Sequence, residues 1–138
     1  MAQTVRKIDY FYVSVPDKPG EAACILSQLH EAGVNLIGFS GFPEGARKAQ
    51  LDFLPEDPAA FTKAARKAGL KLSKKKTGFV IQGEDCPGAV AELLGKLSAA
   101  GVNVTAIQAI ASGAGVYGGI SRVKAADVRK AAKALGAS

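Results

Sequence analysis

The chain has 138 residues, of which 48% are hydrophobic and 22% are charged, and its formal net charge is +6. This composition excludes an intrinsically disordered chain, which would carry fewer apolar residues and more charge. The length allows one ordinary domain or two small ones. Two cysteines, Cys24 and Cys86, and one histidine, with no CxxC spacing, exclude a zinc or dithiol redox motif. Two free thiols suit a reducing compartment.

No segment has the features of a targeting signal. Leu97–Ser121 is uncharged and long enough to span a bilayer, but it contains Asn103, Thr105, Gln108 and several glycines, so we reject a membrane span. We therefore expect a cytoplasmic protein.

The first quarter of the chain predicts a strand, a helix and a second strand. Residues 8–15, IDYFYVSV, are β-branched and aromatic, and they stop at Pro16. Pro19 suits a first helical turn, and Gly33 suits a left-handed cap at the end of the helix. Apolar residues recur between them at helical spacing: Ala22, Ile25, Leu26 and Leu29. Residues 34–39 then predict the second strand.

The next segment completes the order strand–helix–strand–strand–helix–strand. Turn residues at 42–46, FPEGA, precede a third strand at 47–55, which ends at a proline. A second helix is predicted over residues 57–68, and Gly69 ends it. Residues 70–74, LKLSK, alternate in polarity and predict a fourth strand.

The second half repeats this order but is shorter. It predicts a strand at 78–83, a helix at 87–100, strands at 102–111 and 115–123, and a last helix. Four glycines, Gly113, Gly115, Gly118 and Gly119, lie between or within two strands, which favours a bulged hairpin over a phosphate-binding loop. No residues remain for a fourth strand. Either the second unit has three strands, or it borrows one from the first unit or from another chain.

The two halves also share residues at a constant offset. DKPGEAACILSQLHEAGVNLIGFS begins at Asp17, and DCPGAVAELLGKLSAAGVNVTAIQ begins 68 positions later at Asp85. We therefore predict two tandem units, residues 1–76 and 77–138. Each is expected to be an α+β unit with an antiparallel sheet and its helices on one face.

The repeated residues suggest a binding geometry. A D-x-P-G turn at a helix start leaves backbone N–H groups free, and these donors suit a carboxylate. The Asn of the later Gly-Val-Asn can accept a hydrogen bond from an ammonium group. If the two lie a few ångströms apart, they suit a free α-amino acid. A purely structural explanation stays open, because Asp and Asn also satisfy local backbone groups in turns.

These two segments, in the order βαββαβ, resemble the ACT domain, a family of small regulatory modules. The resemblance covers nearly the whole chain as two tandem copies, the second truncated. It implies a ferredoxin-like fold that binds a free amino acid where two such domains meet, at the first turn and at the start of the second strand. The matching positions are Asp17, Gly20, Asn35, Asp85, Gly88 and Asn103. It also implies a regulator attached to an enzyme, although this chain contains no catalytic domain.

The two cysteines differ in their expected surroundings. Cys24 lies near the apolar stripe of its helix and is expected to be a small buried residue. Cys86 lies in the repeated turn at a helix start, where the helix dipole favours a thiolate. We therefore add Cys86 to the expected ligand-binding residues as a hypothetical reactive thiol.

We expect a non-catalytic protein without a cofactor, because no catalytic or metal-binding constellation is present. The expected partners are an amino-acid ligand, a separate enzyme subunit, and a second copy of the chain that supplies the missing strand. One alternative is nucleic-acid binding through the basic run Lys63–Lys76, which has seven Lys or Arg and no acid. The strands lack the aromatic platform of single-strand binders, which counts against it. The other alternative is a purely structural partner of an enzyme subunit. The sequence leaves open which amino acid binds, whether both sites work, and which enzyme or pathway is regulated.

Overall fold

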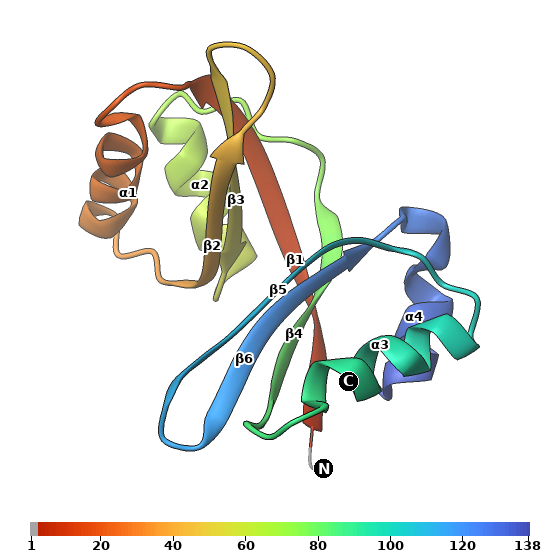
Figure 1. The fold of residues 1–138 in the computed structure, drawn as a ribbon. Helices are drawn as coiled ribbons and strands as arrows, with labels where there is room; N and C mark the ends of the chain where they lie inside the picture. The colour runs from red at the N-terminus through yellow and green to blue at the C-terminus, as the bar shows by residue number, and fades with distance from the viewer. Residues whose placement is uncertain (1–2) are drawn as a thin grey trace. The chain divides into compact units, whose positions relative to one another are not determined.

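The structure is a computed structural model that describes residues 3–138, with six strands and four α-helices in an α+β arrangement (Figure 1). Its contacts divide the chain into two compact units. The first-repeat unit is Asp9–Lys76. The second-repeat unit is Thr77–Ser138 together with residues 3–8. Residues 3–8 thus belong with the second repeat, whereas the sequence had placed them with the first.

The first-repeat unit is a three-stranded antiparallel sheet with two helices on one face. Its elements are β1 (Gln3–Pro16, from Asp9 on), α1 (Glu21–Glu31), β2 (Leu36–Pro43), β3 (Lys48–Pro55) and α2 (Pro58–Lys67). The strand order is β2-β3-β1, with Phe11 opposite Phe53 and Val13 opposite Leu51. These four side chains pack against Ile25 and Leu29 of α1 and Phe61 and Ala65 of α2. The stripes of both helices predicted from the sequence therefore face the core.

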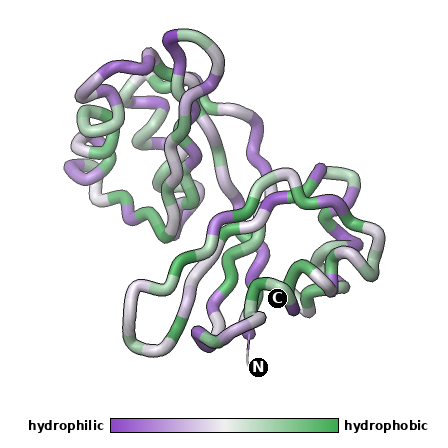
Figure 2. The backbone as a smooth tube through the Cα atoms, viewed as in Figure 1, coloured by the Kyte–Doolittle hydropathy of each residue, from purple (hydrophilic) through white to green (hydrophobic). Residues whose placement is uncertain are grey.

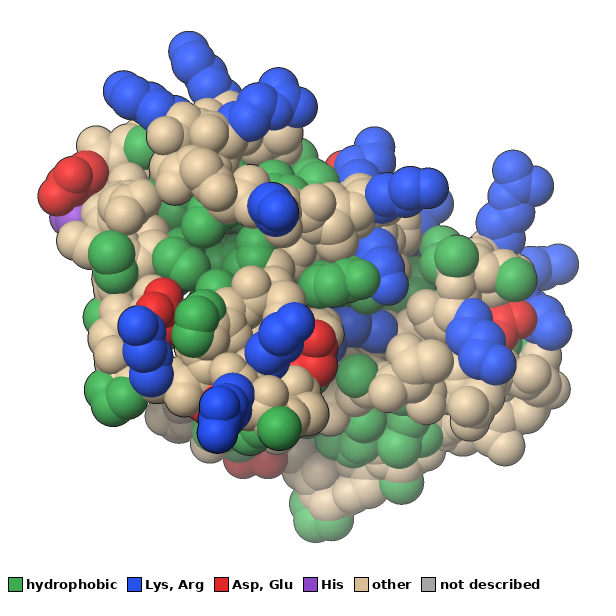
Figure 3. Space-filling view, turned by 90° about the horizontal axis from the view of Figure 1, so that it is seen from above, with side chains coloured by type: hydrophobic (Ala, Val, Ile, Leu, Met, Phe, Trp, Pro, Cys, Tyr) green, Lys and Arg blue, Asp and Glu red, His purple; other side chains and the backbone are tan. Residues whose placement is uncertain are grey.

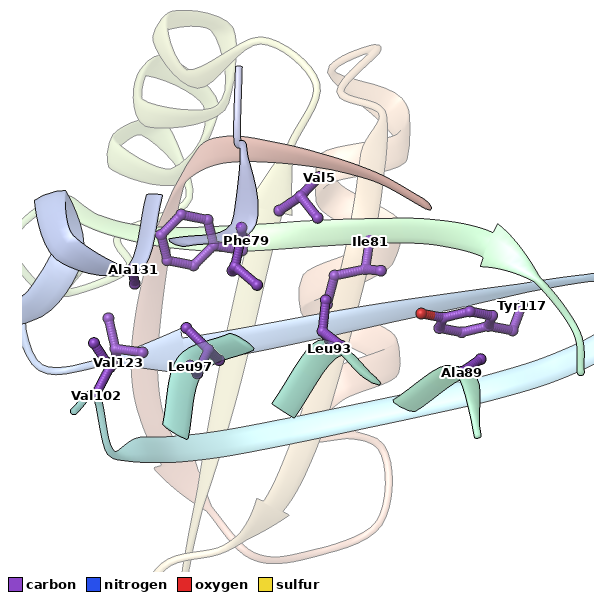
Figure 4. Close-up of a cluster of buried hydrophobic side chains, with 11 residues drawn as sticks. Val5, Phe79, Ile81, Ala89, Leu93, Leu97, Val102, Tyr117, Val123 and Ala131 are labelled. Atoms are coloured by element: carbon purple, nitrogen blue, oxygen red, sulfur yellow. The ribbon is translucent and has the colours of Figure 1, made fainter. Parts of the chain in front are cut away.

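The second-repeat unit has the same plan. Its elements are β4 (Lys76–Glu84), α3 (Ala89–Ala99), β5 (Val104–Gly113), β6 (Val116–Val123), a single 3₁₀ turn η1 (Ala125–Asp127) and α4 (Val128–Leu135). Phe79 lies opposite Ser121, just as Phe11 lies opposite Phe53 at the positions 68 residues earlier. Apolar residues extend along much of α3 (Figure 2). Leu93 and Leu97 of that helix pack on Phe79 and Ile81 of β4 (Figure 4).

The N-terminal part of β1 supplies the fourth strand of the second-repeat unit, where the strand order is β1-β4-β6-β5. Val5 is 5% exposed and lies in the core of this unit (Figure 4). The last residue joins the same strand, because Ser138 donates to the Val5 carbonyl and accepts from the Lys7 amide, both at 3.1 Å. The missing strand therefore comes from the same chain. The reason for expecting a homodimer is removed, and the oligomeric state stays a prediction.

The predicted fourth strand of the first repeat, residues 70–74, is wrong. This segment has no strand conformation, although it passes beside β1. The Ser73 amide donates to the Tyr12 carbonyl, but the Tyr12 amide donates to the Ser73 hydroxyl instead of to a carbonyl. A side chain thus replaces the backbone acceptor, and the ladder does not propagate.

The glycine-rich segment of the second repeat is a hairpin, as predicted. Its turn is formed by Ala114 and Gly115, both with positive φ (62° and 74°), and the register between β5 and β6 shifts between Ile110 and Gly113. A two-residue turn with two positive φ angles matches the twist of the flanking strands. Within residues 3–138, no helix is both long and apolar enough to cross a membrane.

Candidate ligand-binding pockets

Each unit has a pocket at the start of its first helix, and the two pockets occupy equivalent positions. The pocket of the first-repeat unit has a volume of about 250 Å³, and that of the second-repeat unit about 340 Å³. We call them pocket A and pocket B. Pocket A is lined by Asp17, Lys18, Glu21, Phe42 and Ala49 among others. The residues 68 positions later, Asp85, Cys86, Ala89, Ile110 and Tyr117, line pocket B.

The repeated D-x-P-G turn forms one wall of each pocket. Gly20 and Gly88 are the N-cap residues of α1 and α3, and their φ angles of 90° and 84° are left-handed. This conformation favours glycine, whose lack of a Cβ atom removes the steric penalty. Proline therefore precedes the helix, instead of lying in its first turn as predicted.

Neither helix start is capped by a side chain, so the Asp side chains do not serve as helix caps. The turns are held through the backbone instead. The amide of Asp17 donates to the Arg47 carbonyl at 2.9 Å, and that of Asp85 donates to the Gly115 carbonyl at 3.0 Å. Each turn is thereby fixed to the hairpin beside it, and Asp17 and Asp85 are among the lining residues. The N–H groups of the first helical turn have no intrahelical acceptors, although the Ala89 amide donates to the Cys86 carbonyl in the turn at 3.2 Å.

The two pockets differ in charge. In pocket A, Lys18 Nζ lies 3.3 Å from Glu21 Oε1, and Asp17 adds a second carboxylate. In pocket B the corresponding residues are Cys86 and Ala89, so Asp85 is the one charged residue of its lining. The Cys86 thiol is partly buried and donates to the Glu84 carbonyl at 3.7 Å.

Tyr117 distinguishes pocket B further. It is 5% exposed, and its hydroxyl accepts a hydrogen bond from Gln3 Nε2 at 3.0 Å, while the same nitrogen donates to the Ala89 carbonyl at 2.9 Å. Burial, followed by the nearby Cys86 and Glu92, raises the pKa of Tyr117 above its usual 10.0. The phenol is therefore neutral at physiological pH. Figure 4 shows its oxygen pointing towards Leu93 in the core of the unit.

The ring of Tyr117 lies over a glycine of the neighbouring strand. Gly83 is its cross-strand partner, and a Cβ atom on Gly83 would lie 2.7 Å from Cε1 of the ring. The equivalent pair in the first repeat is Val15 opposite Ala49. The second repeat thus has glycine where the first has valine, and tyrosine where the first has alanine.

The structure brings some of the expected site residues together and separates others. Asp17, Asp85, Cys86 and Gly88 line the pockets, and Gly20 is the N-cap beside the first. Asn35 and Asn103 line neither pocket. They follow the 11-residue helices α1 and α3, which separate them from the turns by about 16 Å at 1.5 Å per residue.

The Asp turn and the Asn of one unit therefore do not line one pocket, and a role of Asn35 and Asn103 in ligand binding stays a prediction. Asn35 instead donates from Nδ2 to Glu56 Oε2 at 3.1 Å, and its carbonyl accepts from the Glu56 amide. A further correction concerns Cys24, which is exposed and not buried, because it lies beside the apolar stripe of α1 and accepts from Gln28 at 3.5 Å.

Lys18 and Glu21 already stand out in the sequence, because they flank the first turn where Cys86 and Ala89 flank the second, but sequence reasoning missed Phe42, Ile110 and Tyr117 as pocket residues. The signal that could have found them was the repeat itself. These are the positions at which one repeat differs from the other close to a matched turn, and such differences indicate where two copies of a pocket have diverged.

The basic run of the first-repeat unit is exposed in all seven positions: Lys63, Arg66, Lys67, Lys71, Lys74, Lys75 and Lys76. Two members have local partners, since Lys75 lies 4.0 Å from Asp9 and Lys76 lies over the Tyr12 ring at 5.1 Å. Lys and Arg side chains stand out at several separate places in Figure 3, with acidic side chains among them. Within residues 3–138, no group of His, Cys, Asp and Glu is arranged to hold a metal ion.

Comparison with known proteins places the fold. No family model matches the chain, and no curated protein matches it in sequence. Among solved structures, a Bacteroides thetaiotaomicron protein superposes with a TM-score of 0.81 at 23% identity, covering 97% of this chain and 88% of that one. The ligand-free regulatory subunit of aspartate kinase from Thermus thermophilus superposes with a TM-score of 0.66 at 18% identity, covering 98% and 93%. The regulatory subunit of aspartate kinase from Thermus flavus gives 0.62 at 18% identity, covering 98% and 94%.

The fold is ACT-like. At these identities the similarity establishes the fold alone, over nearly the whole length of the matched regulatory subunits. It agrees with the ferredoxin-like architecture that the sequence predicted.

Proposed function

We propose that the chain is a non-catalytic regulatory protein that binds a free α-amino acid in its turn pockets. The observation that carries this proposal is the equivalence of the two pockets. Each combines a left-handed glycine, a helix start without a side-chain cap, and an aspartate among the lining residues, at positions separated by one repeat. The ACT-like fold, shared with regulatory subunits of aspartate kinases, supports the regulatory part.

The groups in each pocket complement both ends of a zwitterion. Backbone N–H groups and the positive end of the helix dipole favour the ligand carboxylate. The carboxylate of Asp17 or Asp85 can accept from the ligand ammonium, and such charge-assisted hydrogen bonds are stronger than neutral ones. Volumes of about 250 and 340 Å³ suit one small molecule. Asp thus takes the role that the sequence had assigned to Asn35 and Asn103.

The regulatory consequence requires a partner. Because the chain carries no catalytic constellation, its ligand would act on a separate enzyme subunit in the cytoplasm. A ligand that binds the folded chain shifts its conformational populations only by its differential affinity for them. The enzyme subunit would respond to that shift by binding one of the conformations preferentially.

The test is a thermal-shift screen of the full chain against the twenty amino acids, because any ligand of the folded state raises its melting temperature. Calorimetric titration of the best ligand then follows for wild type, Asp17→Asn and Asp85→Asn. Loss of one charged hydrogen bond costs roughly 1.5–3 kcal/mol, or about ten- to hundredfold in affinity, in at least one of the two variants. Asn103→Ala is the control and should bind normally. If no amino acid raises the melting temperature, the proposal is wrong.

A second candidate function, nucleic-acid binding, rests on the seven exposed cations of the basic run. Phosphate-driven binding must weaken steeply with salt. A mobility-shift titration at two salt concentrations distinguishes it, and retained RNA or DNA affinity at low salt that disappears at high salt would favour it.

A further inference from the structure

We propose that pocket B selects an amino acid with an uncharged, apolar side chain, and that pocket A does not. This inference rests on the proposed function and specifies the ligand class of one of its two sites. It follows from the residues by which the two repeats differ around the same turn.

The lining of pocket B is almost wholly apolar away from the turn. Its members beyond the turn are alanines, Val90, Ile110 and Tyr117, whose hydroxyl is already bound by Gln3. Asp85 and the start of α3 can hold the ammonium and carboxylate groups, which every amino acid carries. The remaining surface offers an incoming side chain no charged partner, so a charged side chain would lose solvation without compensation.

Pocket A has the opposite character at the matched positions. Lys18 and Glu21 form an ion pair of 3.3 Å where pocket B has Cys86 and Ala89. An apolar side chain placed there would cover charges that prefer water. An apolar ligand side chain is therefore favoured in pocket B and disfavoured in pocket A. Both effects contribute to the preference of such a ligand for pocket B.

The position of the Tyr117 ring beside pocket B is fixed by its neighbours. Space for it exists because Gly83 replaces the valine of the first repeat, and its hydroxyl is fixed by Gln3. A buried aromatic side chain held in one position gives a rigid apolar surface at low entropic cost. Ile110, at 73% exposed, lies at the mouth of the pocket where it can cover a ligand side chain.

The experiment compares ligands and matched variants of the full chain by calorimetric titration. L-Leucine, L-isoleucine, glycine and L-lysine are titrated into wild type, Ile110→Ser and Phe42→Ser. Phe42 is the counterpart of Ile110 in pocket A, and both side chains are exposed, so neither change is expected to prevent folding. Leucine or isoleucine should bind at least about tenfold more tightly than glycine or lysine, because part of the side chain leaves water.

The variants then locate the site. Ile110→Ser should weaken leucine binding at least about threefold, whereas Phe42→Ser should leave it unchanged. If lysine binds more tightly than leucine, or if Phe42→Ser alone weakens leucine, the assignment is overturned while the proposed function stands. If none of the twenty amino acids binds, the proposed function and this inference fail together.

Discussion

Introducing a side chain at Gly83 is expected to destabilise the second-repeat unit, because the space above this residue is already filled. A Cβ atom would lie 2.7 Å from Tyr117 Cε1, closer than real Cβ contacts, and 3.1 Å from Gln3 Cγ, which is tighter than most of them. The ring cannot easily move away, since it is 5% exposed and Gln3 holds its hydroxyl at 3.0 Å. Overpacking of this kind costs about 1–3 kcal/mol. We expect the loss of stability caused by Gly83→Val to lie at the upper end of this range.

The first repeat supplies a compensating change. Tyr117→Ala alone should cost about 3–5 kcal/mol, as does truncation of other large buried aromatic residues. The double variant Gly83→Val/Tyr117→Ala recreates the pair Val15–Ala49 at the same register. We therefore expect its loss of stability to be smaller than the sum of the single losses, with a coupling of about 1–3 kcal/mol.

Urea unfolding monitored by circular dichroism measures these free energies. Gly118→Ala is the control on β6, because the nearest atom to a Cβ there is 3.9 Å away. The reasoning is refuted if Gly83→Val is no more destabilising than the control. It is also refuted if the two substitutions prove additive.

Three further predictions follow from individual contacts. Asp57→Ala should destabilise the first-repeat unit by about 0.5–2 kcal/mol in the same urea assay, since its carboxylate accepts from the Ala59 and Ala60 amides and caps α2. Because the pKa of Tyr117 is raised in the folded state, its contribution to stability is present below pH 10 and decreases as the pH rises above 10. Melting curves between pH 9 and about 11 should therefore show a steeper loss for wild type than for Tyr117→Phe, and equal slopes would contradict the assignment. Native alkylation followed by peptide mapping should label the exposed Cys24 faster than the partly buried Cys86, and the reverse order would instead indicate an activated Cys86 thiolate.

The sequence predicted the features that depend on local chemistry and on the repeat. The apolar stripes of the helices, the left-handed Gly33, the end of α2 before Gly69, and the glycine-rich hairpin all follow from nearest-neighbour patterns and are present in the structure. Equivalent cross-strand pairs at an offset of 68 confirm that the repeat is structural.

What could not be predicted depends on contacts between residues distant in the chain. Arg6 and Lys7 interrupt the apolar pattern, so periodicity alone started the first strand at Ile8, yet β1 begins at Gln3 because β4 pairs with it. The alternating segment 70–74 has suitable side chains for a strand but lacks a complete backbone ladder. The distance between Asn35 and the Asp17 turn depends on the length of α1, which lies between them. Comparing the two residues with the two ends of an amino acid does not take this length into account.

The sharing of β1 has a consequence for synthesis on the ribosome. Residues 3–8 of β1 emerge about 70 residues before their partners in β4, and the rest of the second-repeat unit follows later still. At about 5–20 residues per second this delay lasts on the order of ten seconds. During that time residues 9–76 can already fold, while the segment before them remains an unpaired strand edge. The two charges of Arg6 and Lys7, which obscured this strand in the sequence, would then protect it from pairing with another chain, as charged residues do on exposed edges.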